Sequence, residues 1–151
     1  MQLSKNFSLK ELTKSETAIR RGIPNEPSAE QIENLKTLVE NVLQPLRDYF
    51  NLPLVVNSGY RSPAVNTLIG GSATSQHMKG EAADIVIPTV DLKDVYLAIM
   101  GNLPYDQLIY EFDSWIHVSF NFIKNRRQNL IAEKKSGKTV YRTYQNDFKA
   151  L

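Results

Sequence analysis

The sequence contains no cysteine, so disulfide bonds and thiolate metal sites are excluded. A bound metal ion would therefore have to be held by histidine, aspartate and glutamate side chains. No apolar run approaches the length of a membrane span, and the first residues lack the apolar core of a signal peptide. We therefore expect no membrane span. We also expect synthesis in the cytoplasm without a signal peptide, so that any action outside the cell would follow lysis or export.

An excess of charge of one sign is also missing, because 18 basic residues are nearly balanced by 16 acidic ones. The net charge of +2 is too small to indicate nucleic acid as the main partner. What the chain does have is 42% hydrophobic residues over 151 positions, which is enough for one globular domain with a hydrophobic core. We expect this domain to be a monomer.

The first third of the sequence has helical patterns. Two capping boxes, Ser8 with Glu11 and Ser28 with Gln31, mark helix starts. After the second box, apolar residues recur at helical spacing and predict the longest helix: Ile32, Leu35, Leu38, Val39, Val42 and Leu43. Pro45 is expected to kink or end this helix, because proline cannot donate to the helical hydrogen-bond ladder.

Beyond residue 51 short apolar runs replace the helical pattern. They predict strands at 54–56, 82–87, 108–110 and 115–120, with short helices at 62–68 and 92–99. The last two strands would form a hairpin around Asp113 and Ser114. Helices followed by strands predict an α+β fold, with a small, mostly antiparallel sheet on which the N-terminal helices pack. We assign residues 1–122 to this domain. Residues 123–151 form a basic segment, expected as a solvated tail or hairpin that extends the same domain.

The only two histidines, His77 and His117, lie in unusual surroundings. With the period of a strand, His117 shares one face with Trp115 and Ser119, while the other face is apolar. Taken alone, such a residue is more typical of a surface histidine than of a metal ligand. Asp84 changes this interpretation because it interrupts the apolar run 82–87. A carboxylate in a buried strand is costly unless it has a cation, a metal ion or N–H donors as partners.

A turn at Gly80 could bring His77 and Asp84 to one point. Together with His117 they would offer three ligands suited to zinc and leave a fourth position open for water. That arrangement is typical of catalytic zinc sites, whereas structural sites usually have four protein ligands. A zinc-bound water becomes acidic enough for hydrolysis near neutral pH.

Hydrolysis also needs a proton acceptor that is not itself a ligand. Glu111 and Asp113 are the candidates, and we favour Glu111 because it is longer and lies on a strand. A two-residue hairpin loop would place Glu111 opposite Ile116, on the wrong face, whereas a longer or bulged loop would place it opposite His117. A solvent-facing glutamate remains the alternative.

Arg61 follows the first predicted strand and precedes a helix start. Its guanidinium group could bind a carboxylate through two parallel hydrogen bonds. A surface arginine without such a role is the alternative.

Three blocks of the sequence resemble one known family: SGYRSPAVN, GGSATSQHMKGEAADI and EFDSWIHVSF. They are similar to the signature blocks of the zinc D-alanyl-D-alanine carboxypeptidase family. That family includes the L-alanyl-D-glutamate endopeptidases of phage lysins and shares the Hedgehog/DD-peptidase fold. The similarity extends from the first helix to about Phe122, and the subgroup that the chain most resembles is a set of short, often phage- or prophage-encoded single-domain proteins.

The resemblance implies that His77, Asp84 and His117 hold one zinc ion per chain. It also implies that Arg61 binds a substrate carboxylate or polarises a carbonyl, and that Ser75 belongs to the substrate-binding set. Several family members place the catalytic acid three residues before the last histidine, where this chain has Ser114. Glu111 is then the best substitute, with Asp113 in reserve.

The function implied is a zinc-dependent hydrolase of peptidoglycan stem peptides, acting as a carboxypeptidase or an endopeptidase. Two alternatives keep the fold without turnover. One is an inactive module that binds cell-wall peptides, and the other is a phage structural component. Only the enzyme requires a general base, so the position of Glu111 in space distinguishes these interpretations.

Overall fold

The computed structural model describes residues 1–148. Its first third is helical and contains, in order, α1 (Leu9–Thr13), α2 (Glu16–Arg21), α3 (Ala29–Leu38), the π-helix η1 (Val39–Leu43) and α4 (Gln44–Phe50). The strands are β1 (Val55–Ser58), β2 (Ala82–Val86), β3 (Gln107–Glu111), β4 (Trp115–Ser119), β5 (Gln128–Lys135) and β6 (Lys138–Thr143). The helices α5 (Pro63–Leu68), the 3₁₀-helix η2 (Gln76–Lys79) and α6 (Leu92–Asn102) lie between strands.

Both predicted capping boxes are present. The Ser8 hydroxyl accepts a hydrogen bond from the Glu11 backbone N–H, and the Glu11 side chain accepts one from the Ser8 N–H. The same reciprocal pair joins Ser28 and Gln31 at the start of α3. These bonds satisfy backbone donors that have no partner within a helix, so they fix where α1 and α3 begin.

The long helix does not end at Pro45. The chain stays helical from α3 through α4, but its hydrogen bonding changes to the π pattern in η1, immediately before the proline. There the Gln44 N–H donates to the carbonyl of Val39, five residues back. A π-turn alters the regular ladder, so this stretch accommodates the proline without ending the helix.

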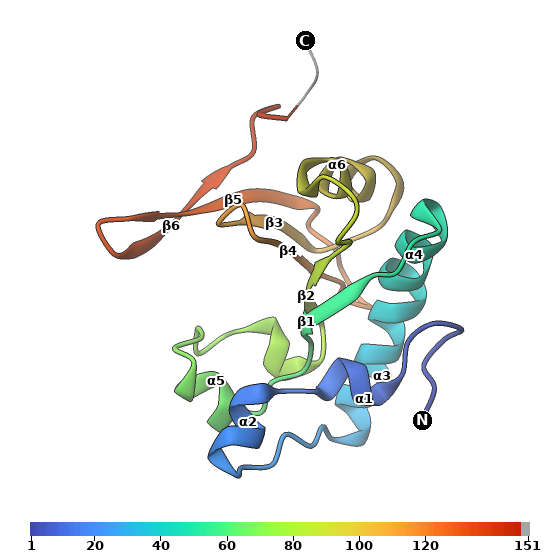
Figure 1. The fold of residues 1–151 in the computed structure, drawn as a ribbon, viewed down its shortest axis with the longest axis vertical. Helices are drawn as coiled ribbons and strands as arrows, with labels where there is room; N and C mark the ends of the chain where they lie inside the picture. Colours follow the sequence, from blue (N-terminus) through green and yellow to red (C-terminus); the bar gives the residue numbers. More distant parts are fainter. Residues whose placement is uncertain (149–151) are drawn as a thin grey trace.

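The six strands form one sheet in the order β1-β2-β4-β3-β5-β6. Every neighbouring pair is antiparallel except β3 and β5, which run parallel. The predicted α+β fold is therefore confirmed, with a sheet that is mixed rather than purely antiparallel. Figure 1 shows α3, α4 and α6 grouped around the centre of the sheet, while the β5–β6 hairpin extends to one side.

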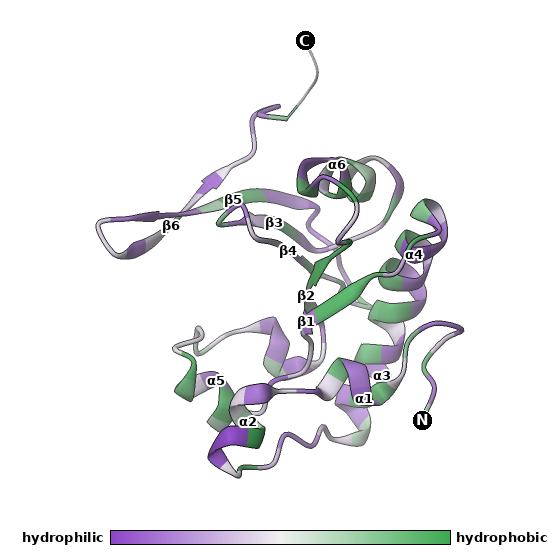
Figure 2. Ribbon diagram, viewed as in Figure 1, coloured by the Kyte–Doolittle hydropathy of each residue, from purple (hydrophilic) through white to green (hydrophobic). Residues whose placement is uncertain are grey.

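The two faces of the sheet differ in character. One face carries Ile85, Leu108 and Ile116, which are fully buried in the main core together with side chains of α3, α4 and α6. The other face carries Asp84 and His117, which are paired directly across β2 and β4. Figure 2 shows β1 and β2 as largely hydrophobic, whereas the tip of the β5–β6 hairpin is hydrophilic. Among residues 1–148, no helix is both long and apolar enough to cross a membrane.

Candidate metal centre

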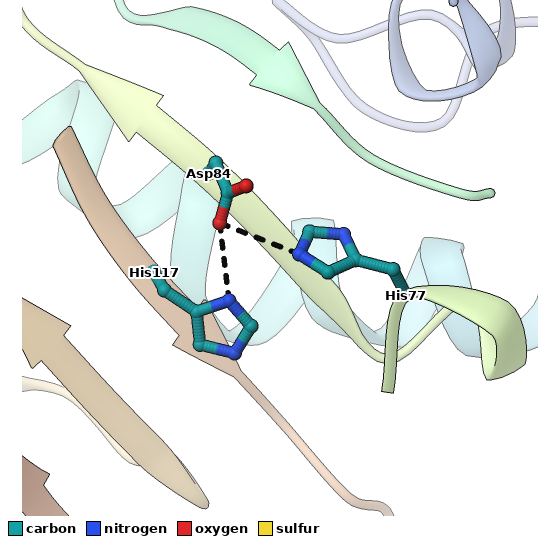
Figure 3. A group of neighbouring side chains, drawn as sticks. All are labelled: His77, Asp84 and His117. Carbon is teal, nitrogen blue, oxygen red and sulfur yellow. Dashed lines mark hydrogen bonds and ion pairs between the residues drawn. The ribbon is translucent and has the colours of Figure 1, made fainter. Parts of the chain in front are cut away.

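His77, Asp84 and His117 come from three elements and meet at one point (Figure 3). Asp84 lies in the middle of β2, opposite His117 on β4, and His77 lies on η2. The Asp84 Oδ1 atom is 3.3 Å from His77 Nε2 and 3.0 Å from His117 Nδ1. One ligand atom from each residue lies within 4.8 Å of the other two, which is the convergence that a metal ion requires.

Local hydrogen bonds hold His77 in place. The Ser75 hydroxyl caps η2 and accepts a hydrogen bond from the His77 backbone N–H. Gly80 ends η2 with a φ of 74°, a conformation that favours glycine. The His77 Nδ1 lies 2.7 Å from the carbonyl oxygen of Gly59. A carbonyl can only accept, so Nδ1 carries the proton and Nε2 faces Asp84.

Gly59, whose carbonyl faces His77 Nδ1, was not among the expected site residues. A Cβ atom at this position would lie 2.2 Å from the Leu12 carbonyl oxygen, so only glycine allows β1 to approach α1 this closely. The neighbouring Tyr60 N–H donates to the same Leu12 oxygen over 2.7 Å. A glycine directly after a strand can indicate a close backbone approach, but in this segment only Arg61 was expected to have a role.

The chemistry of these three side chains fits a divalent metal ion such as zinc. Burial alone would raise the pKa of Asp84, but the two adjacent histidines outweigh it and hold the pKa well below its usual range. Because Nδ1 faces the Gly59 carbonyl, Nε2 is the His77 nitrogen left to bind a metal ion beside the Asp84 carboxylate. Two imidazoles and one carboxylate are a donor set that zinc prefers.

Glu111 lies beside the three potential ligands. Its Oε1 atom is 3.7 Å from His117 Nδ1. Burial and the Asp84 charge raise the pKa of Glu111, while His117 and the Trp115 indole oppose the rise. Neither of the two pairings considered from the sequence occurs. The hairpin turn has three residues, 112–114, and Glu111 pairs with Trp115, which shares the His117 face.

Asp113 lies at the tip of the hairpin and is exposed, with a backbone φ of 53°. Burial and the nearby Asp113 carboxylate raise the pKa of Tyr110 to about 12. Tyr110 alternates with Glu111 along β3, so Asp113 is associated with the opposite face of the sheet. The structure therefore brings Glu111 to the group formed by His77, Asp84 and His117, and does not bring Asp113 there.

Arg61 also faces this group. Its backbone N–H donates to the His77 carbonyl over 3.1 Å, and its Nη2 lies 3.5 Å from the Ser75 hydroxyl. Burial lowers the pKa of Arg61, and the charges of Asp84 and Glu111 oppose that change. Within residues 1–148 the buried Arg61 Nε has no hydrogen-bond partner, so the guanidinium group has a donor to spare for a ligand.

Comparison with known proteins gave a family match. A family model described as Peptidase M15 matches residues 5–119. No curated protein matches the chain. The matched region ends at the last residue of β4, so it contains all the residues discussed above and excludes β5 and β6.

Proposed function

Because the chain belongs to the peptidase M15 family of zinc-dependent D-alanyl-D-alanine carboxypeptidases and endopeptidases, we propose that it hydrolyses peptide bonds in peptidoglycan stem peptides. The observation that carries this proposal is the position of Glu111. Its carboxylate lies next to the group formed by His77, Asp84 and His117 without being one of the three. Hydrolysis needs a proton acceptor that is not a ligand, and Glu111 is a carboxylate in the position to serve as one.

The ligands of one zinc ion would be His77 Nε2, Asp84 Oδ1 and His117 Nδ1, the atoms that face one another. When bound, zinc supplies a Lewis acid that polarises the scissile carbonyl and acidifies a water molecule. Gly59 supports this arrangement, because its carbonyl accepts the His77 Nδ1 proton and so directs Nε2 inward.

Glu111 would act as the general base. Its Oε1 takes a proton from the attacking water and then delivers it to the nitrogen of the departing amine. The backbone of Glu111 is held in β3 by its pairing with Trp115 of β4. This pairing keeps the half-buried carboxylate near the reacting atoms. Asp113 is too exposed and too far around the turn to share this role.

Arg61 and Ser75 would bind the substrate. A guanidinium group with a free buried donor can hold a carboxylate or a developing oxyanion through directed hydrogen bonds. The Ser75 hydroxyl lies beside Arg61 Nη2 and also holds the His77 backbone, so it connects the substrate-binding side to the ligands.

Digestion of purified peptidoglycan, with and without a metal chelator, tests the proposed function. The expected result is chelator-sensitive release of peptides, and mass spectrometry would show which bond is cut. A cleaved D-Ala–D-Ala bond would indicate the carboxypeptidase type, and a cleaved L-Ala–D-Glu bond the endopeptidase type. Intact peptidoglycan after incubation with zinc-loaded protein would contradict the enzymatic function. It would favour the inactive peptide-binding module instead.

A further inference from the structure

The C-terminal hairpin extends the sheet beyond the part of the chain that matches the family. Strand β5 runs parallel to β3 and antiparallel to β6, so both strands continue the sheet on the Glu111 side. Every second residue of β5 and β6 therefore lies on the sheet surface that carries Asp84, Glu111 and His117. In Figure 1 the hairpin projects from the edge of the sheet away from β1.

One row of directly paired residues connects the proposed base to this hairpin. Trp115 pairs with Glu111, Glu111 pairs with Ala132, and Ala132 pairs with Tyr141. Residues paired directly across strands point to the same face of the sheet. Tyr141 therefore lies on the same face as Glu111, two strands away, at roughly 10 Å between backbones for strands about 4.8 Å apart.

Ala132, which lies between Glu111 and Tyr141, leaves room for their side chains to approach each other. Ala132 carries only a methyl group, which is almost completely covered. A small residue in the middle of the row lets the longer side chains on either side lean toward each other above it. Tyr141 is itself 55% exposed, so its ring borders solvent as well as the site and can be reached by a ligand.

The charges of the site act on the tyrosine hydroxyl. Burial and the carboxylates of Glu111 and Asp84 raise the pKa of Tyr141, so the hydroxyl stays protonated near neutral pH. A protonated phenol is a hydrogen-bond donor. Arg61 approaches the same carboxylates from the β1 end of the sheet, so the two donors lie on opposite sides of the proposed metal-binding group.

We propose that Tyr141 is a substrate-binding residue. Its hydroxyl donates a hydrogen bond to a backbone carbonyl of the stem peptide, on the side of the scissile bond away from Arg61. This inference rests on the proposed function for the identity of the peptide. It gives the C-terminal hairpin a role that the matched region alone does not supply.

The variant Tyr141→Phe removes only the hydroxyl, and Tyr49→Phe is its matched control. Tyr49 is 61% exposed on α4, on the opposite side of the molecule from β6 in Figure 1. A synthetic stem pentapeptide, containing both the L-Ala–D-Glu and the D-Ala–D-Ala bond, serves as substrate. We expect Tyr141→Phe to lower kcat/KM by about fivefold to tenfold, the effect of one neutral hydrogen bond. Tyr49→Phe should change it by less than twofold.

A binding measurement separates this proposal from the proposed function. In the Glu111→Gln background the peptide should bind without turnover, and binding can be followed through Trp115, the one tryptophan of the chain. Tyr141→Phe should raise the Kd about fivefold to tenfold in that background. A Kd and kcat/KM equal to those of the Tyr49→Phe control would overturn the role of Tyr141.

If the wild type binds the pentapeptide without cutting it, the peptidase function fails, and the Kd ratio still decides the role of Tyr141. Absence of any binding would overturn both proposals.

Discussion

The centre of the sheet and its C-terminal hairpin differ in what holds their side chains in position. At the centre, Asp84 and His117 project from strands whose other side chains, such as Ile85 and Ile116, are fully buried. A register shift there would move core residues into the site and ligands into the core, so burial fixes the ligand positions. The hairpin strand β6 is largely exposed, and its pairing with β5 holds it in position.

Burial therefore fixes the register of the paired strands that carry Asp84 and His117, whereas the hairpin depends on strand pairing without a buried face to fix it. Asp106 links the two regions, because its carboxylate accepts hydrogen bonds from Gln76 beside His77 and from Arg126 before β5. Substitutions at the centre should therefore have large effects on chemistry. Substitutions toward the hairpin should have smaller effects on binding or stability.

The largest effect is expected for Asp84→Asn. The amide keeps the size of the side chain but removes the negative charge that a divalent metal needs from this donor set. Zinc affinity should fall by more than about a hundredfold. Substitutions of residues that only support the ligands usually lower metal affinity by about a hundredfold at most, and loss of a ligand should exceed that. Competition with a chromophoric chelator measures the affinity, and the exposed Asp94→Asn on α6 is the control. Equal zinc affinity in both variants would remove Asp84 from the ligand set.

Glu111→Gln should keep zinc and fold but reduce turnover. Loss of a general base typically costs about 10²- to 10⁴-fold, because a glutamine cannot accept the proton. Asp113→Asn is the matched control and should be mild, since asparagine also suits a left-handed turn position. Single-turnover hydrolysis of the stem pentapeptide, with metal content measured for both variants, provides the comparison. The reverse ranking would make Asp113 the base.

Arg61→Lys should lower kcat/KM by roughly tenfold to a hundredfold, the equivalent of one charge-assisted hydrogen bond. Lysine keeps the charge but loses the planar fork and the buried Nε donor. Thermal unfolding should be nearly unchanged, because the backbone bond from residue 61 to the His77 carbonyl remains. Wild-type kinetics in this variant would show that Arg61 does not bind the substrate.

The smallest effect on chemistry is expected for Asp106→Asn, which should mainly reduce stability. Hydrogen bonds from Arg126 hold the pKa of Asp106 at about 2, below its ordinary value. A lowered pKa means that the charged form stabilises the fold fully above about pH 4 and progressively less as the pH falls toward 2. The variant should lose about 1–3 kcal/mol near neutral pH and show a weaker acid dependence in chemical denaturation. An unchanged acid dependence would contradict the role of this link.

Much of the centre could be predicted from the sequence, because its signals are local. The capping residues Ser8 and Ser28 fixed helix starts, and Asp84 was conspicuous as a carboxylate in an apolar run. The pairing of Glu111 was not predicted, because the three-residue turn depends on a positive φ angle at Phe112, which a phenylalanine does not indicate.

The surroundings of the centre were less predictable. The π-turn before Pro45 was not predicted, because a proline in a helical pattern indicates a kink or an end and not the hydrogen-bond pattern that accommodates it. The parallel pairing of β5 with β3 joins segments about twenty residues apart without a hairpin turn to mark it. Tyr141 lies near the site only because of that pairing, so no local pattern could have pointed to it.

We propose that one zinc ion held by His77, Asp84 and His117 is required for peptide hydrolysis. The most direct test is to titrate metal-free protein with zinc while following cleavage of the stem pentapeptide. The rate should rise in proportion to added zinc and level off at one equivalent per chain. Full hydrolysis by protein that elemental analysis shows to be free of transition metals would contradict the claim.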